Sequence, residues 1–209
     1  MEALIGVAVL ATGRPCHLRY NYEQQQQYTG KRSPFFTTVR YAADKATGKI
    51  KAMEADWIVD HGPYSEFGDL LTLRGAQYIG AGYGIENIRG LGKTVCTNHG
   101  WGAAFRGYGA PESEFASEVL IDELAEKLGM DPLELRCYKP GDTNPSGQAP
   151  EVFSLPDMID IMRPKFKAAK EKAAANSTDT VKRGVGVAIG IYGCGLDGPD
   201  SAESWAQYN

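Results

Sequence analysis

Apolar and polar positions alternate most clearly between Ser33 and Gly62, and this alternation predicts a β-hairpin. One side of the first strand carries Phe35, Thr37, Val39 and Tyr41. The segment "KATGK" has the composition of a turn, and Ile50 to Val59 reads as the returning strand.

Helical spacing of apolar residues appears in three places. Leu4 to Leu10 predicts a short core helix that Gly13 and Pro15 terminate. The clearest helix begins at Pro111 and ends at Gly129. Its predicted buried stripe is Phe115, Val119, Leu120, Leu124 and Leu128. A third helix begins after Ser154, and its predicted apolar side is Met158, Ile159, Met162 and Phe166.

Two further strands are predicted, from Cys16 to Tyr22 and from Val185 to about Tyr192. The region from Gly62 to Gly109 is rich in glycine and aromatic residues, so we expect irregular backbone with short strands there. A long irregular stretch of this kind is typical of a binding site or an interface. The fold class predicted from these elements is α+β, with mixed sheets and packed helices.

Composition narrows the class of protein without identifying a reaction. The chain has 209 residues, 43% of them apolar, and a net charge of -4, which is ordinary for a soluble globular protein and favours neither nucleic acid nor an anionic membrane. Four dispersed cysteines without a C-x-x-C pair argue against a zinc ribbon or an iron–sulfur cluster held by this chain alone. We expect reduced thiols and a cytoplasmic location.

The stretch "WGAAFRGYGAPESE" is the main candidate for a site. Gly107 and Gly109 bracket Tyr108 directly before the predicted helix, so backbone amides at this turn could face an anion or an oxo group, and Tyr108 could stack on a planar substrate. The alternative is a tight structural turn in which Tyr108 packs and Arg106 pairs with an acid. The residues alone favour this alternative without excluding the first interpretation. Arg74 lies in a second charged group, with Glu66 and Asp69. Such a group is usually a solvated loop, although the planar guanidinium of an arginine here could hold a carbonyl or carboxylate.

The same stretch also carries a family resemblance. "AFRGYGAPES", "IDELAEKLGMDPLELR", "NIRGLGKTVCTN" and "YTGKRSPF" resemble the molybdenum hydroxylases, the family of xanthine dehydrogenase and aldehyde oxidase. The resemblance covers the whole chain and is strongest to the bacterial aldehyde oxidoreductases of sulfate reducers. It implies hydroxylation of an aldehyde to a carboxylic acid at a molybdenum centre carried by molybdopterin cytosine dinucleotide.

The resemblance also assigns roles to individual residues. The backbone of Arg106 would lie beside the molybdenum, with Phe105 and Gly107 flanking it. Tyr108 would line the substrate channel, and Arg74 would orient substrate. Glu112 stands where the family usually has glutamine.

A second stacking position of the family corresponds here to Leu196, which is aliphatic. Two aromatic rings can sandwich a purine whereas an aliphatic wall cannot, so we expect aldehydes rather than purines as substrates. A xanthine- or purine-type hydroxylase and a non-catalytic scaffold remain the alternatives.

The resemblance further implies that much of the enzyme lies outside this sequence. Residues 1–150 would belong to the first molybdenum-cofactor-binding domain, and residues 151–209 would supply a connecting helix and the start of the second. No catalytic residue is expected in the chain, because the general-base glutamate would lie beyond Asn209. The 2Fe–2S clusters would also lie on other segments, and the complete enzyme would be a homodimer.

Overall fold

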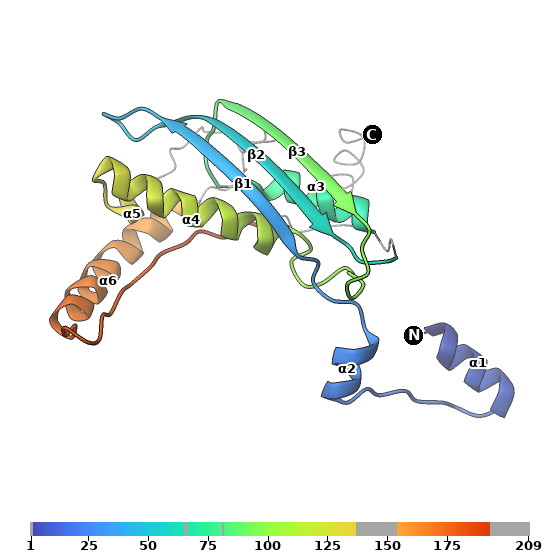
Figure 1. Cartoon of the computed structure of the whole chain (residues 1–209). Helices are drawn as coiled ribbons and strands as arrows, with labels where there is room; N and C mark the ends of the chain where they lie inside the picture. The colour runs from blue at the N-terminus through green and yellow to red at the C-terminus, as the bar shows by residue number, and fades with distance from the viewer. Residues whose placement is uncertain (1, 65–66, 81, 137–153, 193–209) are drawn as a thin grey trace.

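The computed structural model describes residues 2–64, 67–80, 82–136 and 154–192. Its centre is a three-stranded sheet in the order β1-β2-β3, formed by Phe35–Ala43, Ile50–Asp60 and Asn87–Val95 (Figure 1). Strands β1 and β2 pair antiparallel, which confirms the predicted hairpin, and β2 and β3 pair parallel. Parallel neighbours need a crossover connection, and helix α3 (Gly68–Tyr78) lies within it.

The prediction of irregular backbone with short strands from Gly62 to Gly109 is therefore wrong over α3, whereas β3 is a strand within that region. Glycine obscures the helix and the full length of the strand in the sequence, since it favours neither helix nor strand. The reason for the glycines is Trp57 of β2. A Cβ at Gly92 would lie 2.4 Å from Cε2 of Trp57, and a Cβ at Gly75 of α3 would lie 3.0 Å from its Nε1. The glycines make room for a buried indole ring.

Helix α4 (Ala110–Leu128) packs with α3 on one face of the sheet (Figure 1). Its predicted stripe is only half right: Leu120, Leu124 and Leu128 contact the core, whereas Phe115 and Val119 are 73% and 43% exposed. The buried line consists of small residues and one isoleucine, namely Ser113, Ser117, Ile121 and Ala125. Small side chains bring the helix close to its neighbours, and the Ser117 hydroxyl accepts from the Gly80 amide at 3.0 Å.

Helices α5 (Pro132–Leu135) and α6 (Leu155–Ala175) share a second, smaller cluster. Leu133, Ile159 and Phe166 are its buried members. The predicted helix after Ser154 is confirmed and contains Pro164. Two of its predicted apolar contacts are wrong, because Met158 and Met162 are exposed.

The N-terminal segment contains two exposed helices, α1 (Glu2–Thr12) and α2 (Tyr22–Tyr28), which lie away from the sheet (Figure 1). The helical prediction for α1 is confirmed, but its assignment to the core is wrong, because none of its described residues is buried. The strand predicted from Cys16 to Tyr22 is also wrong. Asn21 forms a capping box with Gln24, and this reciprocal pair starts α2 at the place where a strand was expected.

The strand predicted from Val185 to Tyr192 forms no ladder with any described strand. The segment instead runs extended along α4, and the amides of Ile189 and Ile191 donate to Glu118 and Glu114, both at 2.8 Å. No described helix has the length and apolar character needed to cross a membrane.

Candidate functional site

The residues from Phe105 to Gly109, here called the arginine turn, form a tight left-handed bend at the start of α4. The φ angles of Gly107, Tyr108 and Gly109 are 89°, 41° and 93°. The Tyr108 amide donates to the Phe105 carbonyl at 2.7 Å, and the Ala110 amide donates to the Gly107 carbonyl at 3.1 Å. Tyr108 is one of two non-glycine residues with positive φ in the described part of the chain, and such a residue points to local constraint.

Both glycines of the arginine turn are required by space as well as by conformation. A Cβ at Gly107 would lie 2.4 Å from Cγ of Pro111. A Cβ at Gly109 would lie 3.1 Å from the Leu71 carbonyl and 3.2 Å from Cβ of Arg74. The turn is therefore pressed against its own helix on one side and against α3 on the other.

Two amides of this turn have no acceptor in the part of the chain that the structure describes. They are the N–H groups of Arg106 and Gly107. The Arg106 side chain is exposed and forms no ion pair with a described residue, whereas the structural alternative paired it with an acid. Free amides beside a helix N-terminus are suited to an oxygen atom or an anion.

Arg32 is the contact of the turn that the sequence did not assign. Its guanidinium lies over the Phe105 ring, 4.7 Å from the centroid. One terminal nitrogen, Nη2, donates to the Arg106 carbonyl, and the other, Nη1, donates to Oε1 of Glu112 at 2.8 Å. The signal in the sequence was "TGKRSP", which contributed to the family resemblance but received no role.

Glu112 lies in the first turn of α4 and is largely buried, with 10% of its side chain exposed. Its Oε2 is buried and has no hydrogen-bond partner among the described residues. A carboxylate at a helix N-terminus is favoured by the helix dipole. The residue therefore fixes Arg32 through one oxygen and leaves the other unsatisfied.

Two residues predicted to contact substrate lie at this turn: Tyr108 belongs to it, and Arg74 of α3 lies beside it. The Tyr108 hydroxyl donates to the Phe67 carbonyl at 2.7 Å. Burial raises the pKa of Tyr108 to about 12, and the positive charge of Arg74 acts in the opposite direction. Arg74 is in addition held by Gln77, at 2.6 Å from its Oε1. Leu196, the third predicted substrate residue, lies outside the described residues.

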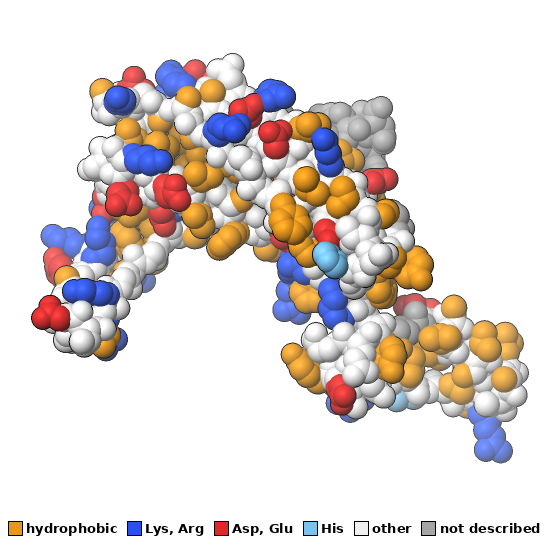
Figure 2. All heavy atoms as spheres, in the orientation of Figure 1, with side chains coloured by type: hydrophobic (Ala, Val, Ile, Leu, Met, Phe, Trp, Pro, Cys, Tyr) orange, Lys and Arg blue, Asp and Glu red, His pale blue; other side chains and the backbone are white. Residues whose placement is uncertain are grey.

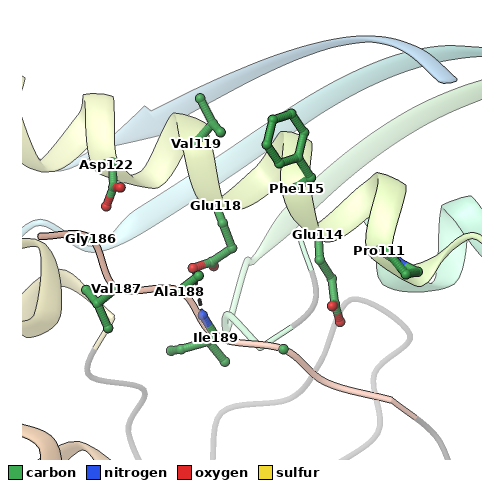
Figure 3. Close-up of a pocket in the computed structure, with 11 residues that line it drawn as sticks. Pro111, Glu114, Phe115, Glu118, Val119, Asp122, Gly186, Val187, Ala188 and Ile189 are labelled. Carbon is green, nitrogen blue, oxygen red and sulfur yellow. Dashed lines mark hydrogen bonds between the residues drawn. The ribbon is translucent and has the colours of Figure 1, made fainter. Parts of the chain in front are cut away.

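A groove of about 510 Å³ lies between α4 and the extended segment after Arg183 (Figure 3). Glu114 and Glu118 point from α4 toward that segment, and burial raises the pKa of Glu114. The described residues that line the groove include Pro111, Phe115 and Val187 but not Arg106 or Tyr108. The groove and the arginine turn are therefore separate features at the same end of α4.

A buried charged group stabilises the middle of α4. Arg136 is fully buried, and its Nε donates to Oε2 of Glu118 at 2.8 Å. The Tyr83 hydroxyl donates to Oε1 of Glu118, and burial together with the Glu118 charge raises the pKa of Tyr83. Sequence reasoning missed this group, because its members belong to three separate segments.

In the described ranges, no group of three His, Cys, Asp or Glu side chains is arranged to hold a metal ion. The groups at the arginine turn that could face a ligand are therefore backbone amides, in a bend formed by two glycines.

The chain is similar in sequence to known proteins. The family described as "Molybdopterin cofactor-binding domain" matches residues 1–138. An aldehyde oxidoreductase of Megalodesulfovibrio gigas is 72% identical over all of this chain and 23% of its own length. A probable xanthine dehydrogenase component from Bacillus subtilis is 30% identical over 94% of this chain and 26% of its own length.

Solved structures give the same result. The crystal structure of the aldehyde oxidoreductase from Desulfovibrio desulfuricans is similar, with a TM-score of 0.87 and 76% identity, over 95% of this chain and 22% of that one. Quinoline 2-oxidoreductase from Pseudomonas putida has a TM-score of 0.66 at 26% identity, over 83% of this chain and 24% of that one. The chain thus spans about a quarter of the length of these relatives. The resemblance to molybdenum hydroxylases is confirmed, and the chain belongs to the molybdopterin cofactor-binding domain family.

Proposed function

We propose that this chain is part of an aldehyde oxidoreductase that hydroxylates aldehydes to carboxylic acids at a molybdenum centre. The observation that carries the proposal is the 72% identity to an aldehyde oxidoreductase over the whole chain, against 30% to a probable xanthine dehydrogenase component. The cofactor in this proposal is molybdopterin cytosine dinucleotide.

The arginine turn fits a bound cofactor of this kind. Two amides, those of Arg106 and Gly107, have no described acceptor, and any side chain at position 107 would collide with Pro111. These features support a role for the Phe105–Gly107 backbone as the seat beside the molybdenum. When bound, the cofactor would supply the redox chemistry, and the protein would orient the substrate and tune the local field.

For the substrate, we assign Tyr108 and Arg74 to the wall of the binding site and Leu196 to a facing position. Support comes from their proximity: Tyr108 belongs to the arginine turn, and Arg74 lies beside it, close enough for its charge to act on the Tyr108 hydroxyl. The hydrogen bond from Tyr108 to Phe67 holds the ring at its outer end, which gives a stacking surface a fixed orientation.

Other segments of the enzyme complete the proposal. They would supply the general-base glutamate and the 2Fe–2S clusters through which electrons leave, and the complete enzyme would be a homodimer. Helix α1 supports the need for further protein, because its apolar residues Leu4, Val7 and Leu10 are all exposed and gather on one lobe of the surface (Figure 2).

The proposal keeps the division at residue 150 between two cofactor-binding domains, with α6 as the connecting helix. It also includes a cytoplasmic location, supported by the two cysteines that the structure describes, Cys16 and Cys96, neither of which forms a disulfide.

The test uses the complete enzyme that carries this chain. Metal analysis should find molybdenum with a cytosine-nucleotide pterin, and the enzyme should oxidise aldehydes but not hypoxanthine. Tyr108→Ala should raise KM for aromatic aldehydes more than for acetaldehyde, whereas Tyr22→Ala, a change at an exposed tyrosine on α2, should alter neither. A metal-free protein, or one that prefers hypoxanthine, would contradict the proposal.

A further inference from the structure

Arg32 contacts three successive parts of the arginine turn and its helix at once. Its guanidinium lies over the Phe105 ring at 4.7 Å, donates to the Arg106 carbonyl, and pairs with Glu112 of α4 at 2.8 Å. Arg32 thus connects the chain entering the turn with the helix that leaves it.

The backbone before Arg32 is itself fixed to the stretch of chain that leads into the turn. The Lys31 amide donates to the Trp101 carbonyl at 3.0 Å, and the Ala103 amide donates to the Lys31 carbonyl at 2.9 Å. On the far side of Arg32, the Ser33 hydroxyl bonds to Nδ1 of the buried His61 at 2.9 Å. The guanidinium therefore projects from a fixed base.

The hydrogen bond to the Arg106 carbonyl has a consequence for the next amide. A trans peptide is planar, and its C=O and N–H point in opposite directions. The described chain contains no cis peptide. Holding the Arg106 oxygen on Arg32 therefore turns the Gly107 N–H away from Arg32, and this N–H is one of the two that have no described acceptor.

We propose that Arg32 is a positioning residue that fixes the peptide plane between Arg106 and Gly107 and so aims the Gly107 amide at the bound cofactor. The inference of a cofactor at this amide rests on the proposed function, whereas the fixing of the plane does not.

Only arginine can make this set of contacts. The guanidinium is a planar fork that donates in two directions while its face lies on an aromatic ring. Lysine keeps the charge but cannot serve the carbonyl, the carboxylate and the ring together. Glycine at 107 removes the side-chain restraint that would otherwise hold the plane, so the external contact decides its orientation.

The experiment compares Arg32→Lys and Arg32→Met with the parent in the complete enzyme. The control is Arg40→Met, since Arg40 on β1 forms an exposed pair with Glu54 at 2.9 Å and does not contact the turn. Amide hydrogen exchange is followed in the peptide that covers residues 105–109, and melting temperature is measured alongside.

The amide that reports is that of Tyr108, which donates to the Phe105 carbonyl at 2.7 Å across the turn. Loss of the Arg32 contacts should loosen the turn and speed exchange of this amide by about tenfold in Arg32→Met, and somewhat less in Arg32→Lys. In the same variants kcat for aldehyde should fall by about tenfold while KM stays within about twofold, because the plane affects the bound cofactor rather than substrate affinity. Arg40→Met should change none of these values.

Exchange that stays at the parent rate in both Arg32 variants would overturn the proposal, whatever the metal content. A fall in kcat with unchanged exchange would overturn it as well. An enzyme without molybdenum in which exchange still rises would leave the fixing of the plane standing and refute the proposed function, so the two failures are distinguishable.

Discussion

Two glutamates of α4 each pair with an arginine from another segment, and the two pairs differ in their burial and in the parts of the structure that they connect. Glu118 in the middle of the helix pairs with Arg136 at the end of α5; they are 9% and 0% exposed, and Tyr83 donates to Glu118 in the core. Glu112 and Arg32, at the helix start, are 10% and 32% exposed and contact the arginine turn. The first pair joins elements of the fold, and the second orients a peptide that faces away from the core. The same chemistry thus serves stability at one site and positioning at the other.

Arg136→Met should give the largest loss of stability, because it leaves Glu118 buried without its counter-charge. We expect the free energy of unfolding to fall by about 3–5 kcal/mol, measured by urea denaturation. Arg163→Met is the matched control: Arg163 pairs with Glu134 at 2.5 Å, but both side chains are over 40% exposed. The loss of unfolding free energy in Arg163→Met should be far smaller. Equal losses in the two variants would show that the buried pair contributes no more to stability than an exposed pair.

Gly107→Ala should have the next largest effect. The new Cβ would meet Pro111 and would hold φ near 89° against its preference, at a cost of about 1–3 kcal/mol. Gly100→Ala, where a Cβ would meet no atom within 4 Å, should change stability by less than about 0.5 kcal/mol. Thermal unfolding compares the two variants, and equal melting temperatures would contradict the geometry of the turn.

Tyr108 at the arginine turn and Tyr83 beside Glu118 should affect the pH dependence of stability differently. Burial raises the pKa of Tyr108 to about 12 from an ordinary value of 10.0. A raised pKa contributes stability that is complete below the unfolded value and is lost as pH rises through the folded value. The parent should therefore lose stability between about pH 10 and 12, and Tyr108→Phe should lose less over that range. Tyr83→Phe should reduce stability already at neutral pH, since the Tyr83 hydroxyl donates to Glu118. Identical pH profiles for the parent and Tyr108→Phe would contradict this interpretation.

Glu112→Gln should have the smallest effect. Glutamine keeps an oxygen for Arg32 and places its amide nitrogen where Oε2 has no described partner. We expect the unfolding free energy to change by no more than about 1 kcal/mol, and exchange in residues 105–109 to rise less than in Arg32→Met. A loss as large as that of Arg136→Met would show that the two pairs are equivalent.

The parts of the fold that could be predicted from the sequence are those in which apolar residues recur at the regular spacing of a strand or a helix. The hairpin of β1 and β2 and helix α4 follow from alternation and from helical spacing. Helix α3 and the full length of strand β3 were missed because Gly75, Gly90 and Gly92 are required by the size of Trp57, a contact between distant segments. Residues such as Phe115 misled the prediction of the buried face, because an apolar side chain can be exposed where small residues form the close contact.

For the site, local sequence identified the bend and its glycines, and family resemblance supplied the roles. Neither identified Arg32, which lies 74 residues from the carbonyl it holds. A contact across that separation depends on how Lys31 pairs beside Trp101, and no periodicity in either segment encodes it.

A crystal structure of the complete enzyme, with the metal located by its anomalous scattering, tests the central proposal most directly. We predict a molybdenum centre facing the amides of Arg106 and Gly107, with Arg32 at the carbonyl edge of the Arg106–Gly107 peptide, opposite its N–H. A metal centre remote from this bend would contradict the proposal.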